Sequence, residues 1–321
     1  MSEQFPQEQA RRWAPPRDPP PDITGAGFHV GTSGYYFDDW LGRFNPPRVT
    51  GRARERLSPA ERADQDRLRF YQKYFSFVEI NNTFYREPLR SYFMDIEGRS
   101  KERMVYAVKV HKDISHTRQP EGEKGKELMA RHVAAVGPLV ETGRFFSFLI
   151  QLDDRVYRTP EFLDYLLATA SVAVKQRLDV HIEFRHRSWH QRYTLQRLKD
   201  HGVGICNTDI PPLPHAFPLK AYATTDKGYV RYSGRNLRNW YPPRGAKRTA
   251  RERLASRNAR YDYFYSEEDV RRHTADQRAL ASKTSSVAIA YNNHYQTQAV
   301  QNALENIRML SEKLRRETNE P

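Results

Sequence analysis

Near the middle of the chain a carboxylate, a guanidinium and an imidazole stand within four residues, in Glu183-Phe184-Arg185-His186. Side chains alternate between the two faces of a strand, so Glu183 and Arg185 would share one face, with His186 at the strand's end. A guanidinium binds anions and an imidazole can move protons near neutral pH. This combination suits the binding and cleavage of an anionic substrate. The alternative is a structural Arg185–Glu183 pair, with His186 capping the next helix.

A second candidate pair, Glu79 and Asn81, would also share one face of a strand. If that face is the interior of the protein, the Glu79 carboxylate is costly to bury unless it is paired or binds a cation. Two interpretations follow from this cost. Glu79 could form an ion pair with Lys109 or Arg185 that holds the site together, or it could position water or a metal ion.

Further polar side chains lie at or just after the ends of other apolar segments, and together they define the predicted site. The predicted catalytic residues are the acids and one imidazole: Glu79, Glu183, His186 and Asp209. The predicted substrate-binding residues are Asn81, Tyr85, Lys109, His116, Gln151, Arg185, Trp189, Arg231, Asn292 and Asn293. Lys109, Arg185 and Arg231 would neutralise developing charge. Glu183 or His186 would handle protons, and Glu79 and Asp209 would position water or a metal ion.

Compact motifs for a known cofactor or nucleophile are missing from the sequence. There is no His-Glu-x-x-His, no Gly-x-Ser-x-Gly and no glycine-rich phosphate loop, and Gly31-Thr32-Ser33-Gly34 does not have the form of a nucleophile elbow. The cofactor is therefore left unknown, although the carboxylates and imidazoles could bind a divalent metal ion.

Eight short apolar segments must position these residues. Isoleucine, valine and phenylalanine dominate their centres, which is typical of buried parallel strands, and stretches with helical spacing lie between them. The segments are 28–34, 77–85, 104–111, 145–152, 179–186, 203–209, 228–234 and 286–294. Strands alternating with helices predict an α/β fold, a (β/α)8 TIM-type barrel over residues 28–314. Polar residues at the strand ends would then meet at one mouth.

The same polar strand ends resemble those of a widespread family catalogued as domain of unknown function 72, whose bacterial members include the YecE-like proteins. The resemblance extends in order over residues 28–310 and implies a barrel of the triose-phosphate-isomerase type. After the seventh strand the family's usual Arg-Leu-His-Gly is here Arg231-Tyr232-Ser233-Gly234. The motifs that carry the resemblance are Gly31-Thr32-Ser33-Gly34, Val78-Glu79-Ile80-Asn81, Ala107-Val108-Lys109, Glu183-Phe184-Arg185-His186 and Asn292-Asn293.

The chain is strongly basic, with a formal net charge of +14 over 321 residues, which favours a polyanionic partner. Nine Lys or Arg residues and one Glu lie in a stretch after the seventh strand, 235–260, where a barrel would place them over the mouth. Six residues of this basic insertion are predicted to bind nucleic acid: Arg238, Trp240, Arg244, Lys247, Arg248 and Arg251. The alternative is a solvated disordered loop.

The remaining segments set the limits of the fold. Residues 1–27 are proline-rich and are expected to form a disordered leader, and residues 315–321 a disordered tail. Cys206 is the only cysteine, which excludes an intrachain disulfide and fits a reducing compartment. With no apolar segment long enough to span a bilayer, the sequence predicts no membrane partner and a cytoplasmic protein. It does not predict the oligomeric state.

Three functions are compatible with this pattern. The leading hypothesis is a hydrolase acting on a phosphate-bearing substrate, such as nucleic acid. A carbohydrate-active enzyme would use Glu79 and Glu183 as a carboxylate pair, with Trp40 and Trp189 as aromatic platforms. In a non-catalytic nucleic-acid-binding protein, the polar mouth would be only structural.

Overall fold

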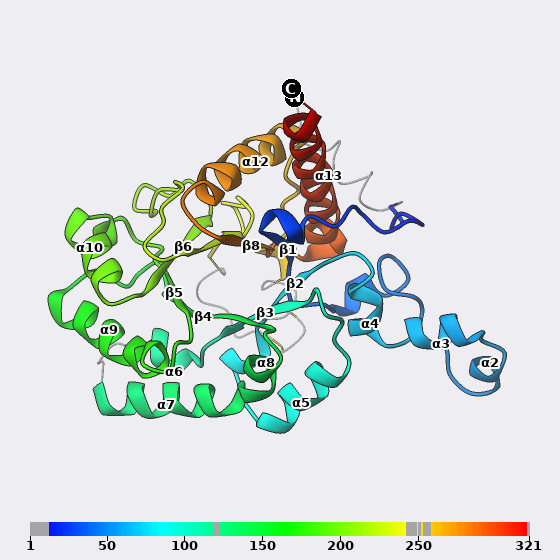
Figure 1. Cartoon of the computed structure of the whole chain (residues 1–321), viewed down its shortest axis with the longest axis horizontal. Helices are drawn as coiled ribbons and strands as arrows, with labels where there is room; N and C mark the ends of the chain where they lie inside the picture. Colours follow the sequence, from blue (N-terminus) through cyan, green and yellow to red (C-terminus); the bar gives the residue numbers. More distant parts are fainter. Residues whose placement is uncertain (1–12, 118–121, 242–248, 250–251, 253–257, 320–321) are drawn as a thin grey trace.

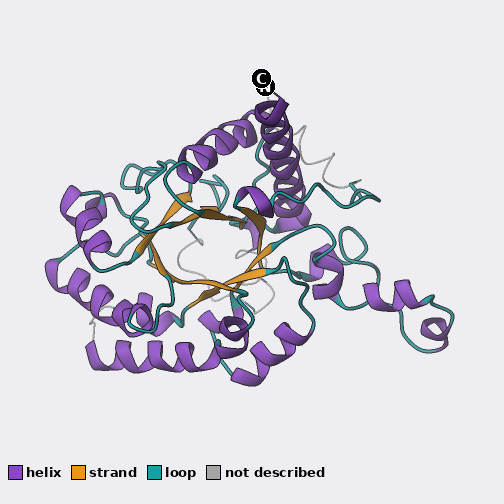
Figure 2. Cartoon of the chain, viewed as in Figure 1, coloured by secondary structure: helices purple, strands orange, loops and turns teal. Residues whose placement is uncertain are grey.

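Eight parallel strands form a closed barrel in which each strand pairs with its neighbour in sequence and β8 pairs with β1 (Figures 1 and 2). This computed structural model describes residues 13–117, 122–241, 249, 252 and 258–319. The strands are β1 (Phe28–Ser33), β2 (Phe77–Ile80), β3 (Val105–Lys109), β4 (Phe145–Gln151), β5 (Val180–Glu183), β6 (Gly204–Asp209), β7 (Lys227–Tyr232) and β8 (Ser286–Tyr291). The predicted TIM-type barrel is confirmed.

Helices surround the barrel on its outer side (Figure 2). They are α2 (Arg52–Glu55), α3 (Pro59–Asp64), α4 (Arg67–Tyr71), α5 (Arg90–Gly98), α6 (Lys112–Ser115), α7 (Gly122–Ala135), α8 (Gly137–Glu141), α9 (Pro160–Val174), α10 (Arg192–Asp200), α12 (Glu267–Ala281) and α13 (Gln298–Asn319). Short 3-10 turns occur at η1 (Thr24–Ala26), η2 (Asp38–Trp40), η3 (Asn82–Phe84), η4 (Arg187–Trp189) and η5 (Tyr295–Thr297). None of the helices that the structure describes is long and apolar enough to cross a membrane.

Local sequence signals explain where several helices begin. The Thr159 hydroxyl accepts a hydrogen bond from the Phe162 backbone N–H at 3.1 Å and caps α9, whose first residue is Pro160. Ser266 and Asp269 form a reciprocal capping box at the start of α12. Both capping signals can be read directly from the sequence.

The two ends of the chain are more ordered than the sequence predicts. The prediction of a disordered leader does not describe residues 13–27, because Ile23 is buried and Trp13 packs against the core; residues 1–12 lie outside the described residues. At the other end α13 continues as far as Asn319, through much of the predicted disordered tail. A long amphipathic helix that already packs on the barrel can extend by a further turn or two because each added residue gains a backbone hydrogen bond.

The barrel interior has an aromatic layer at its middle and a polar layer at the carboxyl ends of the strands. Phe77, Phe146 and Tyr229 pack edge to face around the middle of the barrel, with ring centroids 5.8–6.1 Å apart. Two residues further along β2 and β7, alternation brings Glu79 and Arg231 to the same inner face. The strand register therefore fixes a polar layer at the carboxyl ends of the strands, where TIM-type barrels place their sites.

One segment projects from the body of the barrel. Between β1 and β2 the chain runs outward through α2 and α3, at the right of Figure 1, before α4 returns it to the barrel. The Ser58 hydroxyl and Glu61 carboxylate form a capping box at the start of α3, which explains why a helix forms in this polar segment.

Candidate active site

Arg231 occupies the centre of the polar layer and joins strands from different sides of the barrel. Its Nε donates to Glu79 Oε2 at 2.7 Å, and one terminal nitrogen donates to Glu79 Oε1 at 2.8 Å. Arg231 and Glu79 thus form a bidentate ion pair. The other terminal nitrogen of Arg231 donates to Glu183 on β5, and Arg185 Nε donates to the second Glu183 oxygen at 2.6 Å. All four side chains are buried, so the site contains a compensated network of two carboxylates and two guanidinium groups.

This network keeps both carboxylates ionised. Burial alone would raise their pKa values, but the charges of Arg231 and Arg185 and their hydrogen bonds outweigh burial and lower the pKa of Glu183 to about 2. The pKa of Glu79 is also lowered, with Arg231 again the main opposing charge. Glu79 additionally accepts hydrogen bonds from Ser33, at 2.9 Å, and from Tyr229. Neither acid is therefore suited to exchanging protons near neutral pH.

Lys109, at the end of β3, is the ionisable group of the polar layer that has no carboxylate partner among the described residues. Its ammonium donates to Gln151 Oε1 at 2.8 Å and lies 3.9 Å from the centre of the Phe84 ring. No carboxylate lies within ion-pair distance of it among the described residues. Burial and the charge of Arg231 lower the pKa of Lys109 to about 7, against the opposing effect of Glu79. Lys109 can thus gain or lose a proton near neutral pH.

A pocket of about 1010 Å³ opens above the polar layer. Seven of the predicted site residues line it: Glu79, Asn81, Tyr85, Lys109, Gln151, Arg231 and Asn292. The Asn81 side-chain oxygen is buried and finds no hydrogen-bond partner in the part of the chain that the structure describes. A buried acceptor of this kind is costly unless a ligand or water supplies the missing donor. The pocket therefore offers an amine, several amides and an unsatisfied acceptor to a polar ligand.

Three predicted catalytic residues lie outside the lining of this pocket, and one of them, Glu183, is held in the charged network by Arg231 and Arg185. Asp209 follows inward-facing Cys206 by three positions and so points to the outer side of β6, where Arg235 Nε donates to its carboxylate at 2.9 Å. His186 lies past the end of β5, and its Nδ1 accepts the Ser188 backbone N–H at 3.1 Å as a cap on η4. His186 thus adopts the capping geometry that the sequence allowed as its alternative.

Four predicted substrate-binding residues also lie outside the lining of the pocket. Arg185 is engaged with Glu183, and the His116 ring packs 4.9 Å from Phe84, where burial and the charge of Lys109 lower its pKa to about 4. Trp189 is fully buried and donates to the Val156 carbonyl at 2.8 Å. Asn293 is fully buried and donates to the Tyr263 carbonyl.

The aromatic platforms expected for a carbohydrate-active enzyme are not available. Trp40, like Trp189, is fully buried, and its indole N–H donates to the His294 carbonyl at 2.7 Å. A sugar ring needs an exposed aromatic face, and neither tryptophan presents one.

The basic insertion is only partly described. Arg238 is exposed, whereas Arg244, Lys247, Arg248 and Arg251 lie outside the described residues. The prediction that Trp240 stacks on nucleic acid is wrong for the described conformation: Trp240 is fully buried and donates to Asp154 Oδ2 at 3.1 Å. Arg260 covers its ring at 3.8 Å, and Arg185 lies 5.5 Å away. Trp240 therefore packs over the charged network.

Sequence reasoning missed the part of the pocket formed after β1. Tyr35, Tyr36, Arg54, Arg62 and Arg67 line the same pocket as Lys109. A signal was present, because eight arginines and four acids lie between positions 43 and 69. The 235–260 stretch carries the stronger charge signal of the two, because only one acid accompanies its nine basic residues.

The available donors do not fit a divalent metal ion. Glu79, Glu183 and Asp209 already accept hydrogen bonds from arginine side chains. Among the described residues no three His, Cys, Asp or Glu side chains lie close enough together to hold a metal. A metal at this site would have to displace a buried guanidinium.

Comparisons with known proteins agree with this architecture. The family described as "Protein of unknown function DUF72" matches residues 29–321. The UPF0759 protein YunF of Bacillus subtilis (strain 168) is 23% identical over 265 residues, which are 79% of this chain and 90% of YunF. A DUF72 family protein of Thermotoga maritima MSB8, TM1631, is 28% identical, with a TM-score of 0.69 over 88% of this chain and 99% of that one. EF0366 of Enterococcus faecalis V583, also a DUF72 family protein, is 21% identical with a TM-score of 0.70, over 88% and 95% of the two chains.

Proposed function

Because the chain belongs to the DUF72 family, whose description assigns no activity, we propose from the pocket itself that it is a hydrolase acting on a phosphate-bearing substrate such as nucleic acid. The observation that carries the proposal is Lys109, a buried amine without a carboxylate partner among the described residues, at the base of the pocket. An amine with a pKa near 7 is matched to acid–base work at neutral pH.

The charge of the polar layer favours one phosphate group. The carboxylates of Glu79 and Glu183 balance the guanidinium groups of Arg185 and Arg231. Protonated Lys109 then leaves one positive charge without a counterion in a buried site, where charges interact strongly. A phosphodiester carries one negative charge and would neutralise it. The bound phosphate would in turn raise the pKa of Lys109 and keep it protonated.

Catalysis of phosphate-ester hydrolysis depends more on positioning the reactants and stabilising the charge of the transition state than on a strong base. In the proposed reaction the Lys109 ammonium neutralises charge on the phosphoryl oxygens, and water attacks phosphorus as the ester P–O bond breaks. Lys109 gives its proton to the leaving oxygen, and the proton lost by water passes to solvent. The amides of Asn81 and Asn292, which both line the pocket, would hold the water.

Arg231 has a different part in this proposal from the one expected. Its three nitrogens are already engaged with Glu79, Glu183, Gln151 and Ser33. It therefore contributes a fixed positive charge beneath the substrate and holds the layer in place. A preorganised charge of this kind stabilises a transition state without rearranging during the reaction.

The test is hydrolysis of a chromogenic phosphodiester, a chromogenic phosphomonoester and a labelled oligonucleotide by the intact protein and by Lys109→Met. Lys109→Met keeps the length of the side chain but removes the amine, and we expect at least a roughly 100-fold loss of turnover. Lys175→Met, an exposed position at the end of α9, is the matched control. Denaturant unfolding should show no loss of stability in Lys109→Met, because the variant no longer buries an ammonium group.

Equal turnover by Lys109→Met and the unchanged protein would contradict this role for Lys109. Absence of hydrolysis with all three substrates would contradict the hydrolase proposal itself. Binding of the oligonucleotide without hydrolysis would favour the non-catalytic nucleic-acid-binding function instead.

A further inference from the structure

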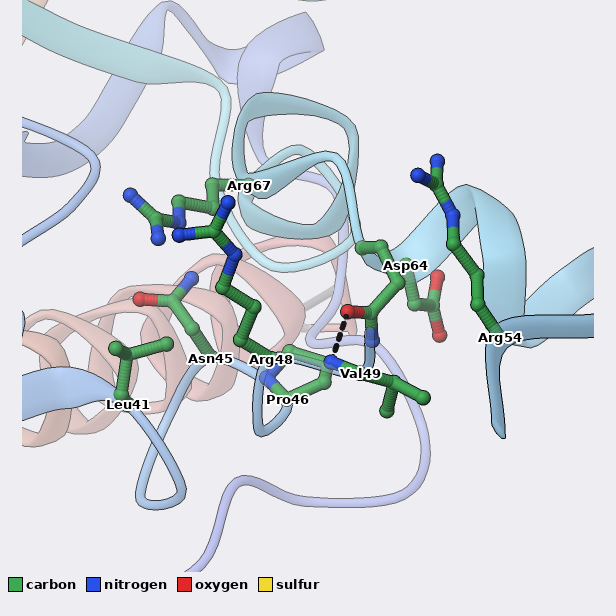
Figure 3. Close-up of a pocket in the computed structure, with 9 residues that line it drawn as sticks. Leu41, Asn45, Pro46, Arg48, Val49, Arg54, Asp64 and Arg67 are labelled. Atoms are coloured by element: carbon green, nitrogen blue, oxygen red, sulfur yellow. Dashed lines mark hydrogen bonds between the residues drawn. The ribbon is translucent and has the colours of Figure 1, made fainter. Parts of the chain in front are cut away.

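A second pocket, of about 390 Å³, lies beside the first in the segment between β1 and β2 (Figure 3). Arg48, Arg54 and Arg67 line it together with Asn45. The guanidinium groups of Arg48 and Arg67 point toward one another and toward the Asn45 amide, whereas Arg54 lies on the other side of Asp64 (Figure 3). We call this the arginine pocket.

The positive charge of the arginine pocket has no ion-pair partner in the part of the chain that the structure describes. Among the described residues no carboxylate lies within ion-pair distance of Arg48, Arg54 or Arg67. Asp64 also lines the pocket, but its carboxylate accepts from Lys73 Nζ at 2.7 Å. Guanidinium groups that lie close together without a counterion repel one another. An anion bound between them would make the net electrostatic interaction of the cluster attractive.

Asn45 supplies an independent indication of a ligand. It is 1% exposed, and neither its side-chain nitrogen nor its side-chain oxygen has a hydrogen-bond partner in the described structure. Burying an amide with both groups unsatisfied costs about 1–3 kcal/mol or more. The amide nitrogen is a donor that an anion's oxygen would satisfy. Its neighbours Arg48 and Arg67 would supply the rest of the anion's contacts.

Three contacts preform the arginine pocket. Arg67 lies 3.3 Å from the centre of the Tyr36 ring, which limits the conformations of its side chain. The Val49 backbone N–H donates to the Gln65 side-chain oxygen at 3.0 Å (Figure 3). The Gln65 side-chain nitrogen donates in turn to the Pro47 carbonyl at 3.3 Å. These bonds tie the two sides of the projecting segment together, so less ordering is needed when a ligand binds.

We propose that the arginine pocket binds a second phosphate group of the same substrate, so that the protein acts on chains carrying at least two phosphates. The link is structural: Arg54, Gln65 and Arg67 line both the arginine pocket and the pocket above Lys109. This inference rests on the proposed function for its assignment to a substrate. The binding of a phosphate chain can be tested without any turnover.

Arg48→Gln is the informative variant because Arg48 lines the arginine pocket and not the pocket above Lys109. The probes are a mononucleotide, single-stranded oligonucleotides of increasing length and inorganic tripolyphosphate, each titrated at several salt concentrations. For probes with two or more phosphates we expect about fivefold weaker binding and a salt slope lower by roughly 0.7, the value for one contact to a single strand. Binding of the mononucleotide should be unchanged.

Arg271→Gln, at an exposed position on α12, is the control for net charge alone. A second variant, Asn45→Leu, removes the unsatisfied amide while keeping its approximate volume. It should unfold at a higher denaturant concentration and bind the longer probes more weakly, a combination that a purely structural asparagine would not give.

The outcomes separate this inference from the proposed function. Weaker binding by Arg48→Gln in a protein that hydrolyses nothing would support the arginine pocket and contradict the hydrolase. Loss of oligonucleotide binding alone would identify a nucleic-acid strand, and loss of tripolyphosphate binding as well would identify a general phosphate-chain site. Unchanged binding of every multiphosphate probe, or an equal effect of Arg271→Gln, would overturn the inference.

Discussion

Replacing Arg231 by methionine tests whether the charged network holds the barrel together. The ordinary carboxyl pKa of 4.5 and the value of about 2 for Glu183 differ by about 2.5, which corresponds to roughly 3 kcal/mol at 1.36 kcal/mol per pKa unit. Removing Arg231 also leaves Glu79 without its guanidinium partner. Since breaking a buried ion pair costs about 3–5 kcal/mol, we expect a loss of that size at pH 7.

The sign of the pH dependence gives the sharper test. In the unchanged protein the pKa of Glu183 is lowered, so its stabilisation is complete above about pH 4.5 and is lost as the pH falls toward 2. In Arg231→Met, burial without a compensating charge would raise the pKa of Glu79. Buried histidines with lowered pKa values, His116, His132 and His181, make both proteins less stable as the pH falls from 7 to 5. The deficit of the variant relative to the wild-type protein should nevertheless shrink over this range, because Glu79 takes up a proton in the folded variant.

The measurement is urea unfolding followed by circular dichroism at pH 5, 6 and 7, with Arg271→Met as a control for loss of an exposed pair. That control should cost less than about 1 kcal/mol, because the Arg271–Glu267 pair is exposed to solvent. If Arg231→Met unfolded at pH 7 at the same midpoint urea concentration as the wild-type protein, the reasoning would be refuted. So would a variant whose deficit stays constant from pH 7 to pH 5.

Two further predictions concern individual side chains. Affinity for a phosphate probe should fall as the pH rises through about 7, because Lys109 loses its positive charge. Lys109→Arg should bind the probe equally well at both ends of this range, because arginine keeps its charge. Binding titrations of both proteins at pH 6 and pH 8.5 test this expectation. Asp209→Asn should lower the free energy of unfolding by about 1–3 kcal/mol, because it weakens the ion pair with Arg235. The rate of hydrolysis should stay near that of the wild-type protein. A large loss of turnover in a variant of normal stability would show instead that Asp209 takes part in catalysis.

The convergence of Glu79, Lys109, Gln151 and Arg231 could be predicted from the sequence. Each lies at the carboxyl end of an apolar run, and alternation places it two positions from an inward-facing residue. The barrel order then leaves no other place for these side chains to meet.

Asp209 shows where the same reasoning fails. Both faces of β6 are buried, so hydrophobicity does not reveal whether Cys206 or Asn207 faces the interior. A wrong choice moves every polar residue of the strand to the other face. The inward direction of Cys206 becomes clear only when the strand is paired with its neighbours.

The burial of Trp240 and the arginine pocket depend on packing between distant segments. Trp240 meets Asp154 across 86 positions, and no local pattern marks that contact. The arginine pocket forms because the segment containing α2 and α3 folds back through Gln65 onto Val49. A loop conformation of this kind is set by tertiary contacts that neither periodicity nor composition encodes.

The reach of Arg231 across the barrel also has a consequence for how the domain can be divided. Its partners Glu79 and Glu183 lie 152 and 48 positions away, on β2 and β5. A fragment ending after β4 would retain the Glu79 carboxylate without this guanidinium, and the complementary fragment would hold Arg231 beside only one of its two acids. Each half-barrel alone would therefore contain buried charges without their partners. Closure of the barrel and assembly of the pocket should then occur as one cooperative event, and the two halves should not fold as independent, exchangeable units.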